Sequence, residues 1–221
     1  MKSIAIDGPA GAGKSTIAKN VAAALGFIYV DTGALYRSIG LYALNNNINT
    51  KSTSDLEKIL KNIEVEIVFL NDKQHIFLNT EDVTDLIRTP AVSMAASDVS
   101  AIPCVREFLF NLQKDLARKN NVVMDGRDIG TVVLPNADVK IFLTACAQER
   151  ARRRFEELCE KGSTVSYEEV LKDVETRDHN DSTREIAPLK PAEDSIIIDT
   201  TGNSLEQSIQ LLIDTVKNNL K

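Results

Sequence analysis

The chain has 221 residues and a formal net charge of −6 at pH 7, with 43% hydrophobic and 26% charged residues. This length suits one α/β domain with a small appended subdomain. The acidic balance argues against a protein that coats nucleic acid through a basic face, and no apolar run approaches the ~20 residues that span a bilayer. The first residues do not follow a signal-peptide pattern, so we expect a cytoplasmic protein without membrane or nucleic-acid partners.

Cysteine and histidine are too sparse to suggest a soft-metal centre. Cys104, Cys146 and Cys159 are far apart and form no C-x-x-C pair, and His75 and His179 are the only histidines. We therefore expect reduced structural thiols and neither disulfides nor a zinc site.

Residues 8–15 match the phosphate-binding pattern G-x-x-x-x-G-K-[ST]. They follow an apolar run at 3–7 that predicts a strand, and they lead into a helical pattern that Gly26 ends. In this setting backbone N–H groups and the positive end of the helix can surround a polyphosphate, with Lys14 on the outer phosphates and Ser15 on Mg²⁺. The predicted nucleotide-binding residues of this P-loop are Gly8, Pro9, Ala10, Gly11, Ala12, Gly13, Lys14, Ser15 and Thr16.

A second strand is predicted at 27–30, and it delivers the sequence Asp-Thr-Gly-Ala-Leu-Tyr-Arg at 31–37 to its carboxyl end. In open α/β sheets ligands bind at that edge. Gly33 would permit a turn there, and Arg37 could face a second anion beside the first. The alternative for this stretch is a turn and helix start without a ligand.

The pattern then changes from helical to two-residue alternation. A helix is expected from Ser54, followed by a β-hairpin at 64–78 with its turn at 71–73, and by a further edge strand within 81–86. Because this segment interrupts alternating strands and helices, it predicts an inserted, small antiparallel β subdomain.

The remaining chain returns to alternating elements. We expect helices at 91–100 and 104–119 broken by Pro103, strands at 121–125, 139–143 and 195–199, and a last helix after a capping box at Ser204. Five such strands predict an α/β fold with a parallel sheet covered by helices.

Arginines from several segments point to a small-molecule kinase, which must hold two anions face to face. Arginines at 150 and 152–154 crowd one predicted helix, although a solvated helix face is the alternative. On the next helix Arg177, Asp181 and Arg184 would share one face, so that one carboxylate could hold two guanidiniums as a phosphate clamp. The alternative is an intrahelical salt bridge worth only ~0.3–0.5 kcal/mol. The sequence has no N-K-x-D guanine reader of the kind a GTPase would need.

With these features in place, the sequence closely resembles bacterial cytidylate kinases over nearly its whole length. The resemblance rests on the P-loop at 8–15, the stretch at 31–37, Met-Asp-Gly-Arg-Asp-Ile-Gly-Thr at 124–131, the spaced Arg177, Asp181 and Arg184, and Ala-Pro-Leu-Lys at 187–190. It implies Mg²⁺-assisted transfer of the γ-phosphoryl group of ATP to CMP or dCMP.

The resemblance also implies the organisation of the chain. It would be a single kinase domain over 1–221, with a P-loop kinase core at about 1–35, 104–150 and 185–221. A monophosphate-binding region with the β insert would occupy about 36–103, and an arginine-bearing helical lid about 151–180. The expected partners are small substrates alone, and the expected state is a monomer.

Residue roles follow from the resemblance at matching positions. The implied acceptor-phosphate ligands are Arg37, Arg127 and Arg184, and the implied cytosine readers are Ser97, Arg106 and Asp128. Arg177 and Asp181 are implied contacts to the sugar or the transferring phosphates. Thr32 is a further substrate residue, and Arg153 is a further ATP ligand. Lys14, Arg127, Arg177 and Arg184 are the expected catalytic set.

The chemistry of this transfer needs no catalytic base. A phosphate monoester has its second pKa near ~6, so the acceptor oxygen is mostly deprotonated at neutral pH. Asp125 ends a strand beside the P-loop and is a candidate for Mg²⁺ with Ser15, the alternative being a structural strand cap. A carboxylate such as Asp128 can accept the cytosine amine, whereas uracil presents an oxygen there. The rival functions are a P-loop kinase for another small acceptor and a non-catalytic nucleotide-binding regulator.

Overall fold

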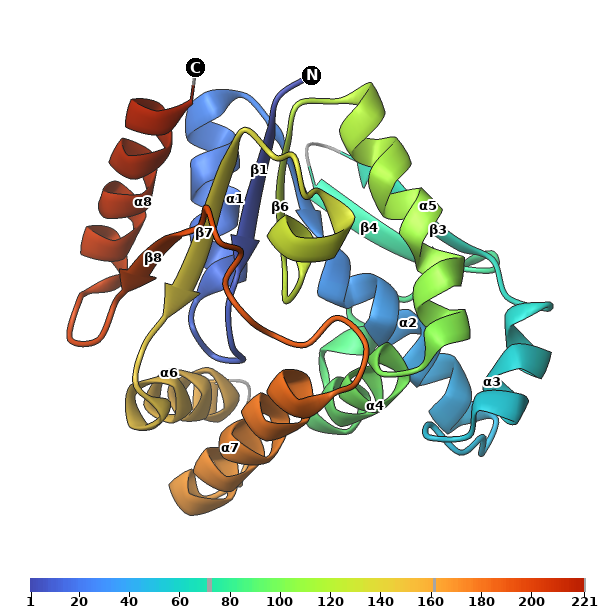
Figure 1. Cartoon of the computed structure of the whole chain (residues 1–221). Helices are drawn as coiled ribbons and strands as arrows, with labels where there is room; N and C mark the ends of the chain where they lie inside the picture. The colour runs from blue at the N-terminus through green and yellow to red at the C-terminus, as the bar shows by residue number, and fades with distance from the viewer. Residues whose placement is uncertain (71–72, 161, 221) are drawn as a thin grey trace.

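The computed structural model describes residues 1–70, 73–160 and 162–220 (Figure 1). Its centre is a parallel sheet of five strands in the order β2, β6, β1, β7, β8. The strands are β1 (Ser3–Asp7), β2 (Ile28–Asp31), β6 (Val122–Gly126), β7 (Val139–Thr144) and β8 (Ile196–Asp199). Ile4 of β1 lies opposite Val123 of β6 and Val139 of β7, and all three side chains are buried. The predicted five-stranded parallel sheet is confirmed.

Helices cover both faces of this sheet. On one face, α1 (Lys14–Leu25) and α8 (Leu205–Asn219) pack apolar side chains against β1 and β7. On the other face, α5 (Pro103–Lys119) and a short π-helical turn at Ile129–Val133 pack against β1 and β6. Figure 1 shows α6 (Ala147–Glu160) and α7 (Tyr167–Thr183) beyond the ends toward which the strand arrows point. The carboxyl edge of the sheet therefore faces this helix pair.

The predicted insert is present as a second, antiparallel sheet. It consists of β3 (Val65–Leu70), β4 (Lys73–Leu78) and β5 (Glu81–Asp82), while residues 71 and 72 of the predicted turn lie outside the described residues. Its buried face joins a core shared with α2 (Thr32–Asn45), α3 (Thr53–Leu60), α4 (Pro90–Ser100) and a 3₁₀ turn at Leu86–Arg88. The insert thus packs next to the helix that follows β2.

Three local expectations are corrected. Gly33 forms no turn, because Asp31 caps α2 directly and its Oδ1 accepts the N–H of Ala34 at 3.0 Å. The predicted helix pair is confirmed as α4 and α5, but Pro103 belongs to α5 as its first residue, since the first helical position needs no N–H donor. The helix α7 ends at Thr183, so Arg184 leaves it as an extended residue and does not share its face.

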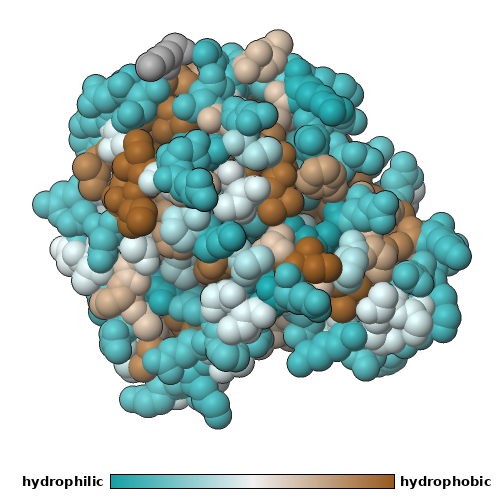
Figure 2. Space-filling view, in the orientation of Figure 1, coloured by the Kyte–Doolittle hydropathy of each residue, from teal (hydrophilic) through white to brown (hydrophobic). Residues whose placement is uncertain are grey.

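Among the described residues no helix is long and apolar enough to cross a bilayer. On the face in Figure 2, hydrophilic residues predominate and apolar ones form separate patches.

Candidate active site

A cavity of about 1700 Å³ opens along the carboxyl ends of β2 and β6, beside the P-loop that follows β1, where ligands bind in open α/β sheets. Residues from the P-loop, α2, α4 and α7 line it. Most of the predicted site residues meet here: Ala10, Gly11, Ala12, Gly13, Lys14, Ser15, Thr16, Thr32, Arg37, Ser97, Asp125, Arg127, Asp128, Arg177, Asp181 and Arg184. Four predicted residues, Gly8, Pro9, Arg106 and Arg153, do not line the cavity.

The P-loop is packed tightly against its surroundings. A Cβ on Gly8 would lie 1.9 Å from the carbonyl oxygen of Leu143, and Gly11 has a left-handed φ of 74°. Larger residues would therefore push the loop off β7. Lys14 is buried and its Nζ donates to the carbonyl of Pro9 at 2.7 Å. Burial, with Arg127 nearby, holds the pKa of Lys14 well below its ordinary value, although Asp125 opposes this.

Ser15 and Asp125 form a pair of hard oxygen donors beside the loop. The Ser15 hydroxyl donates to Asp125 Oδ2 at 2.9 Å, and the Tyr29 hydroxyl donates to Oδ1 at 2.8 Å. Burial and then Asp31 raise the pKa of Asp125, while Lys14 lowers it. Magnesium takes few protein ligands and fills its shell with water and phosphate oxygens, so a hydroxyl and one carboxylate fit it. A larger cluster of acidic, His or Cys ligands is absent among the described residues.

A pair of arginines shares the capping carboxylate of α2. Asp31 Oδ2 accepts from Arg37 Nη2 at 2.7 Å and from Arg88 Nη1 at 2.9 Å. Burial would raise the pKa of Asp31, but the two guanidiniums outweigh it and lower the pKa to about 2. The Nε of Arg37 is buried and has no hydrogen-bond partner among the described residues. Sequence reasoning missed Arg88, which lines the cavity from the 3₁₀ turn.

A buried carboxylate lies between two further arginines. Asp128 forms ion pairs with Arg106 Nη2 and with Arg184 Nη2, the latter at 3.2 Å. Ser100, which sequence reasoning also missed, accepts from both arginines: Arg184 donates to its Oγ at 3.0 Å and Arg106 to its carbonyl at 3.2 Å. Arg106 reaches Asp128 from α5 and does not line the cavity, so it acts on the cavity wall through this carboxylate.

The third carboxylate, Asp181, does not hydrogen-bond to Arg177 and Arg184, the two partners that the helix spacing predicted. It accepts from Arg127 Nε at 2.8 Å and from the Ser97 hydroxyl at 3.2 Å. Arg127 comes from the end of β6 and displaces the expected intrahelical partners. Arg177 is left with a buried Nε that has no hydrogen-bond partner among the described residues. Burial, and then the charge of Arg127, lower the pKa of Arg177 to about 10, although Asp181 opposes this.

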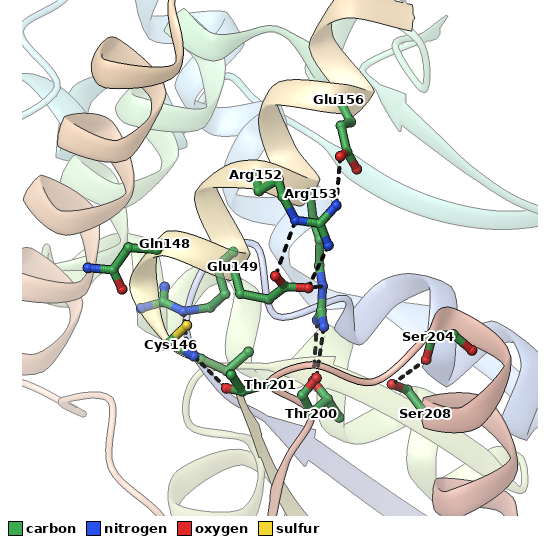
Figure 3. Close-up of polar contacts among 12 residues, drawn as sticks. Cys146, Gln148, Glu149, Arg152, Arg153, Glu156, Thr200, Thr201, Ser204 and Ser208 are labelled. Carbon is green, nitrogen blue, oxygen red and sulfur yellow. Dashed lines mark hydrogen bonds and ion pairs between the residues drawn. The ribbon is translucent and has the colours of Figure 1, made fainter.

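The arginine run on α6 divides between two sides of the helix. Figure 3 shows Arg152 and Arg153 around Glu149, with Arg153 Nη2 donating to the carbonyl of Thr200 at 2.9 Å. Arg154 lines the cavity in place of Arg153, because neighbouring helix residues point about 100° apart. The geometry therefore does not support Arg153 as an ATP ligand.

Arg150 has a different environment from the rest of that run. It is buried, and it donates to the carbonyl of Ala10 at 2.9 Å and to Asp178 Oδ2 at 2.6 Å. It thereby ties the P-loop to α7.

A P-loop at the carboxyl edge of a parallel sheet, facing a cluster of arginines, defines a P-loop phosphotransferase. A solved structure of an uncharacterized protein from Eubacterium ventriosum is similar in fold, with 14% identity, a TM-score of 0.55 and coverage of 98% of both chains.

Sequence comparison gives the family. The model of the cytidylate kinase family matches residues 4–218. The cytidylate kinase of Caldicellulosiruptor bescii is 54% identical over 211 residues, which are 96% of this chain and 93% of that protein. That of Carboxydothermus hydrogenoformans is 52% identical over 213 residues, 96% of each. The chain belongs to the cytidylate kinase family.

Proposed function

We propose that the chain transfers the γ-phosphoryl group of ATP to CMP or dCMP, giving ADP and CDP or dCDP. Membership of the cytidylate kinase family supports this reaction. The structural observation that carries it is the buried Asp128 carboxylate, held by Arg106 and Arg184 in the wall of the cavity that also contains the P-loop. This arrangement provides an acceptor site facing a donor site.

On the donor side, the P-loop amides and Lys14 bind the phosphates of ATP. Ser15 and Asp125 would hold Mg²⁺, which neutralises charge on the phosphates when bound. Burial lowers the pKa of Lys14, and nearby phosphate oxygens would raise it by favouring the charged form. Lys14 thus gains a charged partner when ATP enters.

On the acceptor side, Arg37, Arg127 and Arg184 hold the monophosphate. Their partners are carboxylates, and Arg37 and Arg177 keep a buried Nε free of protein hydrogen bonds among the described residues. A planar guanidinium can give two parallel hydrogen bonds to a phosphate, so the arginines that line the cavity suit this role. Arg177 then bridges to the transferring group, and the reaction proceeds by alignment and charge neutralisation.

Base selection rests on Asp128. Its carboxylate accepts a hydrogen bond from the exocyclic amine of cytosine. The ion pair with Arg106, which does not line the cavity, holds this carboxylate in place. Uracil would place an oxygen against that carboxylate and leave a buried acceptor unpaired, which costs ~1–3 kcal/mol. Ser97, Thr32 and Asp181 lie in the same wall and are proposed contacts to the rest of the nucleoside monophosphate.

The regions proposed from the sequence can be assigned to these roles. The core at about 1–35, 104–150 and 185–221 holds ATP and also contributes Arg127 and Asp128 to the acceptor site. The region at about 36–103 supplies the rest of the monophosphate site, and the lid at about 151–180 supplies Arg154 and Arg177. A mobile lid would exclude water from the transferring phosphate. We propose that the chain acts as a monomer, because the proposed donor and acceptor residues line one cavity within this chain.

The test is a panel of nucleoside monophosphates in a coupled assay of ADP release. We expect turnover with CMP and dCMP at least tenfold above that with UMP, AMP or GMP. Preferred turnover with another acceptor would identify a different small-molecule kinase. ATP binding without acceptor-dependent turnover would identify a nucleotide-binding regulator.

A further inference from the structure

Asp7 is a buried carboxylate that does not line the cavity and forms no ion pair with any of the described residues. It is the last residue of β1, directly before the P-loop, and is 3% exposed. Asp7 accepts two backbone N–H groups from another segment: Oδ1 accepts from Ile129 at 2.8 Å and Oδ2 from Gly130 at 2.7 Å.

The segment that Asp7 holds follows the acceptor residues directly. Ile129 and Gly130 open the π-helical turn, and the preceding Arg127 and Asp128 carry the contacts to Asp181 and to Arg106. The first N–H groups of a helical turn lack partners within it. Asp7 satisfies two of them, and so fixes the peptide units immediately after Asp128.

The fit between the two segments is close. A Cβ on Gly130 would lie 3.4 Å from Asp7 Oδ2 and 3.2 Å from Cδ of Lys140. In the sheet, Asp7 lies opposite Gly126, so its strand and the strand leading to Asp128 are in register. Two charge-assisted bonds to successive amides define both the position and the rotation of this backbone.

We propose that Asp7 is a positioning residue that sets the orientation of Asp128 and Arg127, and thereby the selectivity for the acceptor base. This rests on the proposed reading of cytosine by Asp128. Asp7 couples the strand that carries the donor loop to the turn that carries the acceptor reader. Asparagine at this position would keep one accepting oxygen and place an amide N–H₂ against the other backbone N–H.

The test compares Asp7→Asn with Asp138→Asn. Asp138 is the control for a carboxylate that accepts a backbone N–H without lining the cavity: at the other end of β1, its Oδ2 accepts the N–H of Ser3 at 2.8 Å, although Asp138 is exposed and pairs with Lys2. For Asp7→Asn we expect the preference for CMP over UMP in kcat/KM to narrow about tenfold and the KM for CMP to rise about tenfold. The KM for ATP should change less than twofold, and Asp138→Asn should leave all three quantities unchanged.

An unchanged CMP-to-UMP ratio in Asp7→Asn, with or without a lower melting temperature, would overturn the proposal, as would an equal rise in both KM values. If Asp7→Asn does not fold, Gly130→Ala decides, since its methyl group presses on the same contact: a narrowed ratio supports the proposal and an unchanged ratio overturns it. A wild-type enzyme without preference for CMP would contradict the proposed function instead, so the two failures are distinguishable.

Discussion

The donor and acceptor halves of the cavity bind phosphate in different ways. The proposed donor half is one continuous loop, residues 8–15, whose proposed phosphate ligands are mostly backbone amides. The acceptor half collects arginines from α2, α5, the end of β6 and the end of α7, and each is held by Asp31, Asp128 or Asp181. Backbone amides need no counter-charge, whereas buried guanidiniums do. The acceptor half therefore carries its own carboxylates, which orient the arginines before any nucleotide enters.

The largest effect is expected from a substitution that changes only the donor half. Lys14→Met removes the one side-chain cation of the P-loop, and we expect kcat/KM for ATP to fall about thousandfold, because transition-state charge on the phosphates loses its partner. Coupled ADP release measures this fall. Affinity for CMP, measured by calorimetric titration, should stay within threefold, and an equal loss of CMP affinity would show that the halves are not separate.

A second change removes a carboxylate from the acceptor half without removing a helix cap. Asp31→Asn still caps α2 but leaves the partly buried Arg37 without its counter-ion, so we expect the free energy of unfolding at pH 7 to fall by about 2 kcal/mol. Urea unfolding measures it.

The same variant gives a pH test. Because the pKa of Asp31 is lowered to about 2 in the folded protein, its contribution is full above its ordinary pKa of about 4 and is lost as the pH falls toward 2. The difference in unfolding free energy between wild type and Asp31→Asn should therefore shrink between pH 4 and pH 2. A difference that stays constant over this range would mean that the two arginines do not stabilise the charged carboxyl.

A third change tests the arginine with a free donor. Arg177→Lys keeps the charge but loses the planar fork, and we expect kcat to fall about hundredfold. The matched control is Arg152→Lys on α6, where the guanidinium pairs with Glu149 and Glu156 at the surface. Steady-state kinetics should give less than a twofold change for that control. Equal falls in kcat for the two variants would mean that Arg177 does not contact the transferring phosphate.

The smallest of these effects concerns selectivity. Asp128→Asn replaces an acceptor-only group with one that can also donate, so we expect the preference for CMP over UMP to narrow by about 1–3 kcal/mol, or roughly 5- to 150-fold. The measurement is the ratio of specificity constants. If the ratio does not move, Asp128 is not the base reader.

The contrast between a contiguous donor loop and an acceptor half assembled from several segments explains what could be predicted from the sequence. The P-loop is contiguous, so spacing alone predicted its position between β1 and α1. The parallel sheet and the hairpin insert followed from periodicity, which reports the local environment of each element. Arg37, Arg127 and Arg184 were named from their motifs, and the structure brings them to one cavity.

The pairings within the acceptor half could not be predicted. Helical spacing finds only neighbours on one helix, whereas Asp181 pairs with Arg127 across 54 positions in the chain. Arg88 and Ser100 stand in ordinary sequence surroundings and become site residues only because the insert and α4 pack beside α2. In the arginine run of α6, the rotation of the helix is set by the buried Ala151 and Leu158, and this rotation turns Arg154 toward the cavity and Arg153 away from it.

The most direct test of a donor half and an acceptor half is to titrate Mg²⁺-ATP and CMP separately, by calorimetry, into wild type, Lys14→Met and Asp128→Asn. We expect Lys14→Met to lose affinity for ATP alone and Asp128→Asn to lose affinity for CMP alone, each by tenfold or more. A loss of affinity for both ligands in either variant, or an unchanged affinity for CMP in Asp128→Asn, would contradict the account.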